Sequence, residues 1–169
     1  KCPLEISIKT RIGMEYLDEW APLLKIYQKF PMKELIIHPR LQKEGYKGTP
    51  HLEAFAEAVE ALQCPLCYNG DITSPETLAH VLEKLPMVDT VMIGRGILQN
   101  PGLLPELKAA STESVALPSC EERLAVLKEF HNSLLAGYQV IMSGDTNTLY
   151  KMKDLWTCLL YTSPSPRDR

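Results

Sequence analysis

The segment most informative about the fold reads Thr90-Val-Met-Ile-Gly-Arg-Gly-Ile-Leu-Gln-Asn-Pro101. Its first four residues are β-branched or apolar, which predicts a short buried strand. Gly94-Arg95-Gly96 then turns the chain into a short helix. The free N–H groups at a helix start carry partial positive charge, and the paired donors of Arg95 match phosphate oxygens. The segment therefore predicts a phosphate site, with an ordinary strand–helix turn as the alternative.

The composition is typical of a globular domain with a core of its own. The chain has 169 residues, of which 45% are hydrophobic and 23% are charged. The net charge of −3 gives no overall attraction to nucleic acid, so a local basic cluster would have to bind RNA. No apolar run is long enough to cross a bilayer, and no signal peptide is visible. The five irregularly spaced cysteines favour free thiols in a reducing cytoplasm.

Strands and helices are expected to alternate through the first 100 residues. Strands are expected at 4–9, 34–38, 65–69 and 90–93, with helices at 16–30, 51–62 and 74–85. This α/β alternation predicts a parallel sheet with helices outside it, either half of a barrel or an open doubly wound sheet. Polar residues follow every strand, and in a (β/α)8 barrel such ends meet on the active-site face. We therefore expect the C-terminal half of a TIM (β/α)8 barrel.

The remainder of the chain predicts a small all-α region. A short helix is expected at 103–110, followed by a polar linker at 111–118. Ser119 is then the expected N-cap of a helix that reaches about residue 142. A second long helix is expected at 146–156. We divide the chain into a barrel half at 1–110, a helical appendage at 111–157 and a disordered or foreign tail at 158–169.

Four blocks of residues together carry a resemblance to a known family. They are Ser7-Ile-Lys-Thr-Arg-Ile-Gly13, Ile37-His-Pro-Arg40 with Tyr46-Lys-Gly48, Asn69-Gly-Asp-Ile72, and Ile93-Gly-Arg-Gly96 with Asn100-Pro101. In this order and spacing they resemble the tRNA-dihydrouridine synthases over residues 4–157. The resemblance implies a flavin-bearing TIM barrel followed by a helical domain that binds tRNA.

The resemblance also implies roles for individual positions. Lys9 and His38 would contact the flavin ring, and Arg40 would face RNA or substrate beside them. The residues implied to bind FMN are Lys9, His38, Asn69, Gly70, Asp71, Gly94 and Arg95. A basic patch that would contact tRNA comprises Arg11, Arg40, Lys43 and Lys47, with a merely solvated loop as the alternative for its lysines.

The implied reaction reduces uridine to 5,6-dihydrouridine in cytoplasmic tRNA. NADPH or NADH would reduce FMN, and a uridine flipped out of the tRNA would accept hydride at C6. In the family a cysteine of the first barrel half protonates C5. Cys2 stands in a different context, so we assign no catalytic acid and expect the chain to be a fragment that is inactive alone. The alternatives are another FMN barrel oxidoreductase, related to dihydroorotate dehydrogenase or old yellow enzyme, and a non-catalytic phosphate- or RNA-binding module.

Other candidate residues have simpler interpretations. Cys64-Pro-Leu-Cys67 has the spacing of a metal or redox pair, but it lacks a second pair and is expected to lie in the core. We therefore expect no metal site. His51, His80 and His131 fall on expected helices or at their starts, where capping or solvation is the favoured role.

Overall fold

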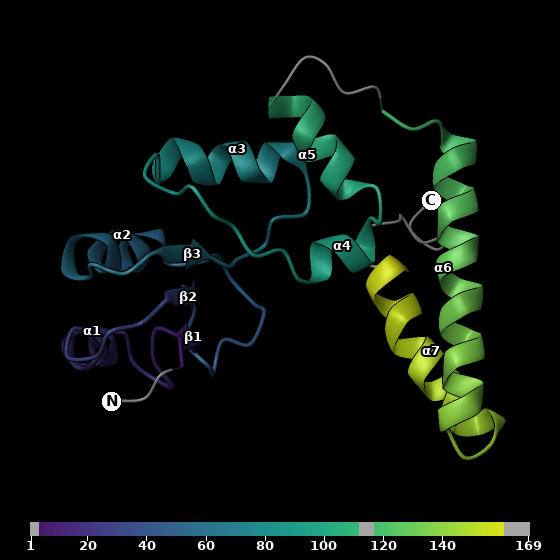
Figure 1. The fold of residues 1–169 in the computed structure, drawn as a ribbon, viewed down its shortest axis with the longest axis horizontal. Helices are drawn as coiled ribbons and strands as arrows, with labels where there is room; N and C mark the ends of the chain where they lie inside the picture. Colours follow the sequence, from purple (N-terminus) through teal and green to yellow (C-terminus); the bar gives the residue numbers. More distant parts are fainter. Residues whose placement is uncertain (1–3, 112–116, 161–169) are drawn as a thin grey trace. The chain divides into compact units, whose positions relative to one another are not determined.

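The computed structural model describes residues 4–111 and 117–160 (Figure 1). These residues form two compact units. The first contains the chain up to Ile72 together with Glu76–Ile93, and the second contains Thr73–Pro75 and the chain from Gly94 onward. The sequence placed a domain boundary after residue 110, whereas this division falls at Gly94. The assignment of the two parts to a barrel and an appendage remains a prediction.

The first unit is built on a parallel sheet of three strands. The strands are β1 (Ser7–Arg11), β2 (Glu34–His38) and β3 (Leu66–Tyr68), in the order β1-β2-β3. Both strand pairs are parallel. The predicted α/β class and the parallel pairing are therefore confirmed. Strand β2 has the bounds expected from its sequence, while β1 continues two residues beyond its expected end at residue 9.

The fourth expected strand is reduced to a single bridge. Val91 pairs in parallel with Tyr68, and two backbone hydrogen bonds support the bridge: Tyr68 N–H donates to Thr90 O over 3.0 Å, and Met92 N–H donates to Tyr68 O over 2.8 Å. The prediction of a full strand at 90–93 was wrong. β3 itself has only three residues, so its ladder offers few partners to the segment beside it.

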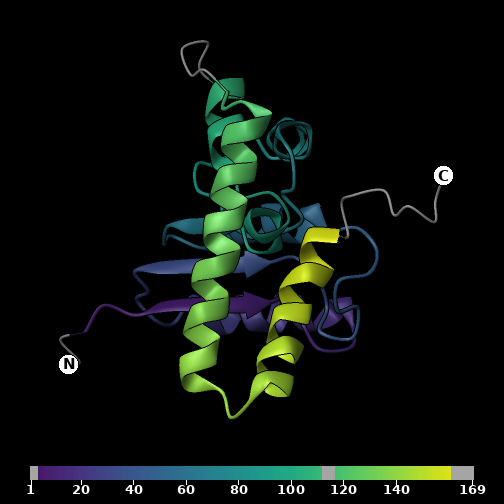
Figure 2. The same cartoon turned by 90° about the vertical axis from the view of Figure 1, so that its right-hand side faces the viewer.

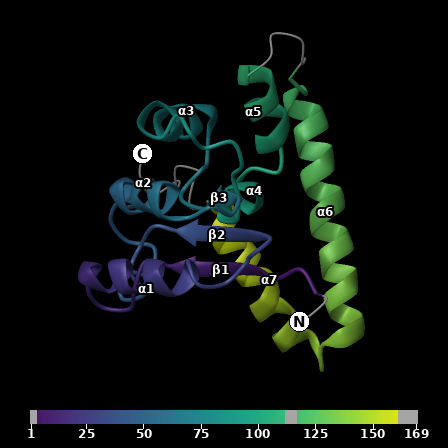
Figure 3. The same cartoon turned by 60° about the vertical axis from the view of Figure 1, so that its left-hand side comes forward.

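Three helices cover one face of the sheet (Figure 3). They are α1 (Trp20–Tyr27), which follows the 3-10 turn η1 (Leu17–Glu19), α2 (Leu52–Ala61) and α3 (Pro75–Lys84). The sheet face towards them carries Leu35, Ile37 and Tyr68, which are fully buried. The Phe55 ring of α2 meets the Tyr68 ring edge-on at a centroid distance of 5.5 Å. The charged residues of β1 and β2 and His38 lie on the opposite face.

The second unit consists of helices. They are α4 (Arg95–Gln99), α5 (Leu103–Ser111), α6 (Cys120–Ile141) and α7 (Asp145–Leu160). Helices α6 and α7 lie side by side, joined by a tight turn (Figure 2). Their shared core contains Met152 and Leu155, against which partly buried side chains of α6 pack.

The start of α6 confirms the expected N-cap. The Ser119 hydroxyl accepts a hydrogen bond from Glu122 N–H, and the Glu122 carboxylate accepts one from Ser119 N–H over 2.7 Å. At the other end of the unit, α7 continues to Leu160, beyond the expected start of the tail at residue 158. Most of the expected linker and the tail from residue 161 lie outside the described residues.

Candidate functional site

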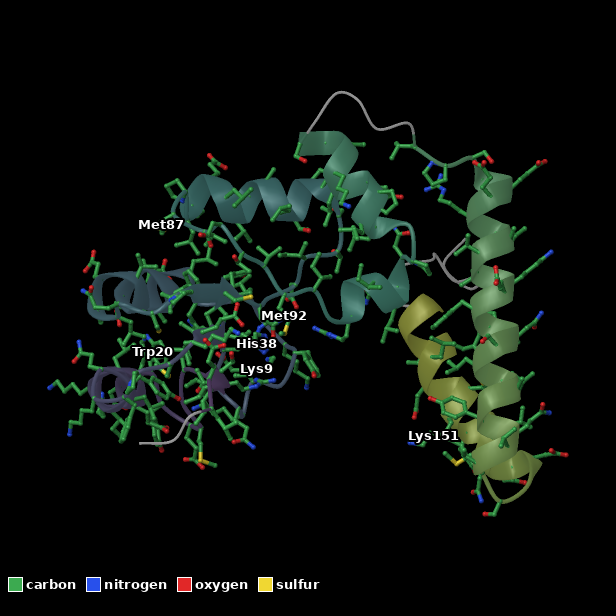
Figure 4. All side chains as sticks on the ribbon, viewed as in Figure 1. Lys9, Trp20, His38, Met87, Met92 and Lys151 are labelled. Carbon is green, nitrogen blue, oxygen red and sulfur yellow. The ribbon has the colours of Figure 1, made fainter. Side chains whose placement is uncertain are left out.

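Three basic side chains share one face of the sheet near the carboxyl ends of its first two strands. Lys9 is in register with Ile36, and Arg11 is in register with His38. Side chains alternate between faces along a strand, and paired residues of parallel strands point to the same side. Lys9, Arg11 and His38 therefore lie on the face opposite the helices, and Figure 4 shows Lys9 and His38 close together. The structure brings these residues to one edge of the sheet.

His38 is a buried and neutral imidazole at pH 7. Its side chain stacks on the Tyr46 ring at a centroid distance of 6.3 Å. Burial, reinforced by the positive charges of Arg11, Lys9 and Arg40, lowers the pKa of His38 to about 4, against a smaller opposing effect of Asp71. A neutral imidazole offers one N–H donor and one nitrogen acceptor, so His38 can hydrogen-bond a polar ligand without a charge of its own.

Lys9 stands beside these groups on the edge strand β1. Burial and the nearby guanidinium of Arg11 lower the pKa of Lys9. Its side chain is nevertheless exposed, and an ammonium group there can donate to three acceptors. Lys9 and His38 together offer a cation and a neutral donor or acceptor on the same face.

The loop after β2, residues 39–50, covers this edge of the sheet. Arg11 holds it from the side of β1, donating to Leu41 O over 2.7 Å and to Gly45 O over 3.0 Å. The Arg11 guanidinium also lies over the Tyr46 ring, 5.7 Å from its centroid. Two donors of Arg11 are thus engaged with the protein's own loop, and its expected contact with RNA remains a prediction.

Two lysines of the same loop, Lys43 and Lys47, are exposed, as the expected basic patch requires. The Lys43 ammonium lies 4.9 Å from the centroid of the Tyr16 ring. Arg40 does not belong to this surface: its side chain is 0% exposed. It turns inward because the Asp71 carboxylate and the Gly48 carbonyl accept its hydrogen bonds, the former over 2.5 Å. The prediction that Arg40 faces RNA is therefore wrong for this structure, in which its side chain is buried.

The segment Asn69-Gly70-Asp71 forms a closed turn after β3. Asn69 N–H donates to Ile37 O over 2.9 Å, and its side-chain amide donates to Met92 O over 2.8 Å. A Cβ on Gly70 would lie 2.7 Å from the Tyr68 hydroxyl oxygen, so only glycine fits there. Asp71 has a φ of 28°, in the left-handed region that non-glycine residues rarely adopt. This turn is held in one specific shape by contacts with both of its neighbouring strands.

Gly94 and Arg95 belong to the second compact unit. Gly94 precedes α4, and its carbonyl accepts a hydrogen bond from Ile97 N–H over 3.2 Å. A Cβ at Gly94 would meet no atom within 4 Å, so its backbone is open to approach. The side chain of Asn100, which follows α4, accepts from Gly102 N–H and donates to the Glu106 carboxylate. The expected turn at Gly94 and the short helix after it are present, although the expected strand before them is only a single bridge.

Sequence reasoning missed two acidic residues that shape the loops of the first unit. The Glu19 carboxylate accepts backbone N–H bonds from Met14, Glu15 and Tyr16 at 2.7–2.9 Å. Its position three residues after the N-cap of η1 was a visible signal. Glu44 pairs with His51 Nε2 at 2.8 Å, which ties the middle of the 39–50 loop to the residue that follows it. His51 thus has a structural partner and was expected to have only a capping or solvated role.

Of the two cysteines in Cys64-Pro-Leu-Cys67, Cys67 lies in the core as expected, whereas Cys64 is only half-buried. Cys67 is buried, and burial together with Glu34 and Asp89 raises its pKa to about 11, so it remains a thiol. Within residues 4–111 and 117–160, no group of three or more possible metal ligands comes together. In the same part of the chain, no helix is both long and apolar enough to cross a membrane.

Comparisons with known proteins identify the family. The family model described as dihydrouridine synthase (Dus) matches residues 1–153. A "Probable tRNA-dihydrouridine synthase" of Staphylococcus aureus (strain MRSA252) is 36% identical over 142 residues, which cover 80% of this chain and 40% of the relative. A protein of the same description from Rickettsia bellii (strain RML369-C) is 28% identical over 138 residues, covering 80% of this chain and 42% of the relative.

The chain thus spans about two fifths of the length of the curated relatives it matches. The matched region contains both the sheet with its edge of polar residues and most of the helical unit. It therefore includes all four of the blocks on which the resemblance rested. This chain belongs to the dihydrouridine synthase family.

Proposed function

We propose that this chain provides the C-terminal part of an FMN-dependent tRNA-dihydrouridine synthase. The complete enzyme would reduce uridine to 5,6-dihydrouridine in tRNA, in the cytoplasm, with NADPH or NADH as the reductant. The observation that supports this best is the gathering of Lys9 and His38, with Asn69 after the next strand, at one edge of a parallel sheet in a chain of this family. In this proposal the sheet belongs to a TIM barrel and the helical unit binds tRNA.

The donor groups at this edge fit a flavin. A flavin ring offers carbonyl and nitrogen acceptors, which suit the Lys9 ammonium and the neutral His38 imidazole. The Asn69–Asp71 turn, in which Gly70 leaves no room for a side chain, would hold the arm that joins the ring to the phosphate. Gly94 and Arg95 belong to the second unit and are proposed as phosphate-binding residues by the resemblance to the family alone, through an open backbone and a guanidinium.

When bound, FMN would supply the hydride transfer between the nicotinamide and the uracil ring. The residues of this chain would act around that chemistry. The cation of Lys9 would stabilise negative charge on a ligand that lies against the same face. His38, whose pKa of about 4 keeps it neutral, would orient an acceptor or donor without repelling the cations next to it. We assign the proton donor to no residue of this chain.

The proposed contact with tRNA involves the exposed lysines of the 39–50 loop. Lys43 and Lys47 lie on the loop that covers the polar edge, and phosphate contacts of this kind are strongly weakened by salt. Arg11 takes part by holding this loop, while its guanidinium remains over Tyr46.

A direct assay tests the proposal. An enzyme of full family length that contains this chain is incubated with unmodified tRNA, FMN and NADPH, and dihydrouridine is measured. The 169-residue chain alone serves as the comparison. We expect dihydrouridine from the full-length enzyme and none from the chain alone, because a three-stranded sheet cannot close a barrel around a ligand.

Two variants of the full-length enzyme sharpen the assay. Lys9→Met should abolish most of the activity and weaken FMN binding, which is read from flavin absorbance after gel filtration. Lys33→Met removes a cation from an exposed ion pair with Glu5 and should change neither. Turnover by the isolated chain, or full FMN occupancy in Lys9→Met, would contradict the proposal.

A further inference from the structure

Arg40 is the most unusual side chain of the first unit, because it is a charged group with no exposed surface. A guanidinium is costly to bury unless its donors and its charge are matched. Nη2 bonds to the Asp71 carboxylate and to the Gly48 carbonyl, whereas Nε and Nη1 have no hydrogen-bond partner among the described residues. A buried cation with some donors lacking a hydrogen-bond partner contributes little to stability by itself. This points to a role of Arg40 other than stabilising the fold.

The two partners of Arg40 lie on different loops. Gly48 is in the loop after β2, where it adopts a left-handed φ of 71°, and Asp71 is in the turn after β3, with a φ of 28°. Both backbones hold conformations that most residues avoid. One guanidinium nitrogen therefore ties together two loops, each at a point where its backbone is in the left-handed region.

The loop after β2 is also tied on its other side. Arg11 of β1 donates to Leu41 O and Gly45 O of the same loop. The loop that carries Tyr46, Lys43 and Lys47 is thus held by two guanidinium groups, that of Arg11 at the end of β1 and that of Arg40 within the loop itself. Arg11 connects it to the first strand and Arg40 connects it to the turn after the third.

We propose that Arg40 is a positioning residue, which sets the Asn69–Asp71 turn relative to the loop of residues 39–50. Its effect on FMN or tRNA rests on the proposed function, but the coupling between the two loops does not. Arg40 acts through Asp71 and Gly48 and touches neither ligand. The two loops form one platform, and loss of Arg40 lets them move independently.

Amide hydrogen exchange of the 169-residue chain tests the coupling directly. In Arg40→Met, we expect exchange at Asn69 N–H, which bonds to Ile37 O, to accelerate by about tenfold or more, with a smaller acceleration in Arg40→Lys. In Asp71→Asn, the acceleration should appear in the opposite loop, at Lys47 N–H and His51 N–H. Lys33→Met, which removes a cation from the exposed pair with Glu5, is the matched control.

Asp71→Asn also protects the test against misfolding. Asparagine keeps an oxygen that can accept from Arg40 Nη2 and tolerates the left-handed φ of residue 71, so this variant supplies a second test where Arg40→Met does not fold. An acceleration restricted to the variant's own loop, or one equally large in helices α1 to α3, would overturn the proposal. Equal exchange rates at Asn69 N–H in Arg40→Lys and Arg40→Met would also overturn the proposal. A lysine keeps the positive charge and most of the side-chain length, so it should preserve part of the coupling.

A binding measurement in the full-length enzyme separates positioning from RNA contact. If Arg40 only positions the loops, Arg40→Met weakens tRNA binding without changing the slope of its dependence on salt, whereas Lys47→Met reduces that slope by about one. A reduced slope in Arg40→Met would overturn the proposal in favour of direct contact. If the full-length enzyme binds neither FMN nor tRNA, the proposed function fails, while the exchange experiment still decides the role of Arg40.

Discussion

The two compact units differ in how their helices are held. In the sheet unit, helices pack on a layer of completely buried side chains that includes Leu35, Ile37 and Tyr68. In the helical unit, none of the residues of α6 is buried, and the shared core with α7 rests on Met152 and Leu155. The comparison indicates that long-range burial stabilises the first unit, while local signals such as caps contribute a larger share to the stability of the α6–α7 pair.

The largest expected effect comes from the core of the sheet unit. Phe55 is 1% exposed and packs edge-on against Tyr68, so Phe55→Ala leaves a cavity between α2 and β3. We expect the free energy of unfolding of this unit to fall by about 3–5 kcal/mol. Urea denaturation followed by tryptophan fluorescence measures it, because Trp20 lies in the same core and donates to Ala54 O. A loss below about 1 kcal/mol would mean that this core is not what stabilises the unit.

The next effect is a dependence of the stability of the sheet unit on pH, which comes from His38. His38 has a pKa of about 4 in the folded chain against an ordinary value of 6.5, so the unfolded chain binds the proton more readily. Stability is complete above about pH 6.5 and falls as the pH drops towards 4, by at most about 3 kcal/mol.

His38→Asn should remove this part of the pH dependence, which urea denaturation at several pH values between about 7 and 4 would show. The control is His80→Asn, an exposed position on α3. An unchanged slope in His38→Asn would contradict the assignment of a neutral buried imidazole.

A truncation in the helical unit should have a smaller effect than the one in the sheet unit. Leu155 is 6% exposed, but its neighbours across α6 are only partly buried and can close the gap. We expect Leu155→Ala to reduce the free energy of unfolding of this unit by about 2 kcal/mol, the lower end for such changes. Circular dichroism at 222 nm during urea denaturation measures the loss. A loss equal to that of Phe55→Ala would remove the distinction between the units.

The smallest effect concerns the cap of α6. Ser119→Ala removes the acceptor for Glu122 N–H and should cost about 1 kcal/mol in the helical unit. Ser119→Asp, which restores an acceptor at the N-cap, should recover most of this loss. If Ser119→Ala were neutral, local capping would not contribute to the helical unit as the comparison proposes.

Features that depend on near neighbours in the sequence could be predicted well. The bounds of β2, the cap at Ser119 and the turn at Gly94 follow from residues within a few positions of one another. The fourth strand was predicted to be longer than it is. Its apolar residues indicate a strand, but they do not show how many residues of the adjacent strand are available to pair with it. At that point β3 offers a ladder of three residues.

The sequence could predict which residues gather at the candidate site, but not which of them form hydrogen bonds with one another. Polar residues after successive strands indicated a common edge, and the register of β1 with β2 places Lys9, Arg11 and His38 on one face. The inward turn of Arg40 could not be predicted, because its partner Asp71 is 31 residues away and no local pattern announces the pair. For the same reason the bonds of Arg11 to two carbonyls about 30 residues further along the chain could not be predicted.

Periodicity and turn chemistry were enough to establish the order of strands and helices, the parallel pairing and the residue types gathered at the polar edge. Tertiary structure alone decided which of those side chains are buried and which of them bind one another. The physical reason is that a strand or a cap depends on contacts within a few residues, whereas the energy of a buried charge depends on distant partners. Arg40 is the clearest instance, since it lies in a segment predicted to be a polar loop, whereas its side chain is 0% exposed and bonds to Gly48 and Asp71.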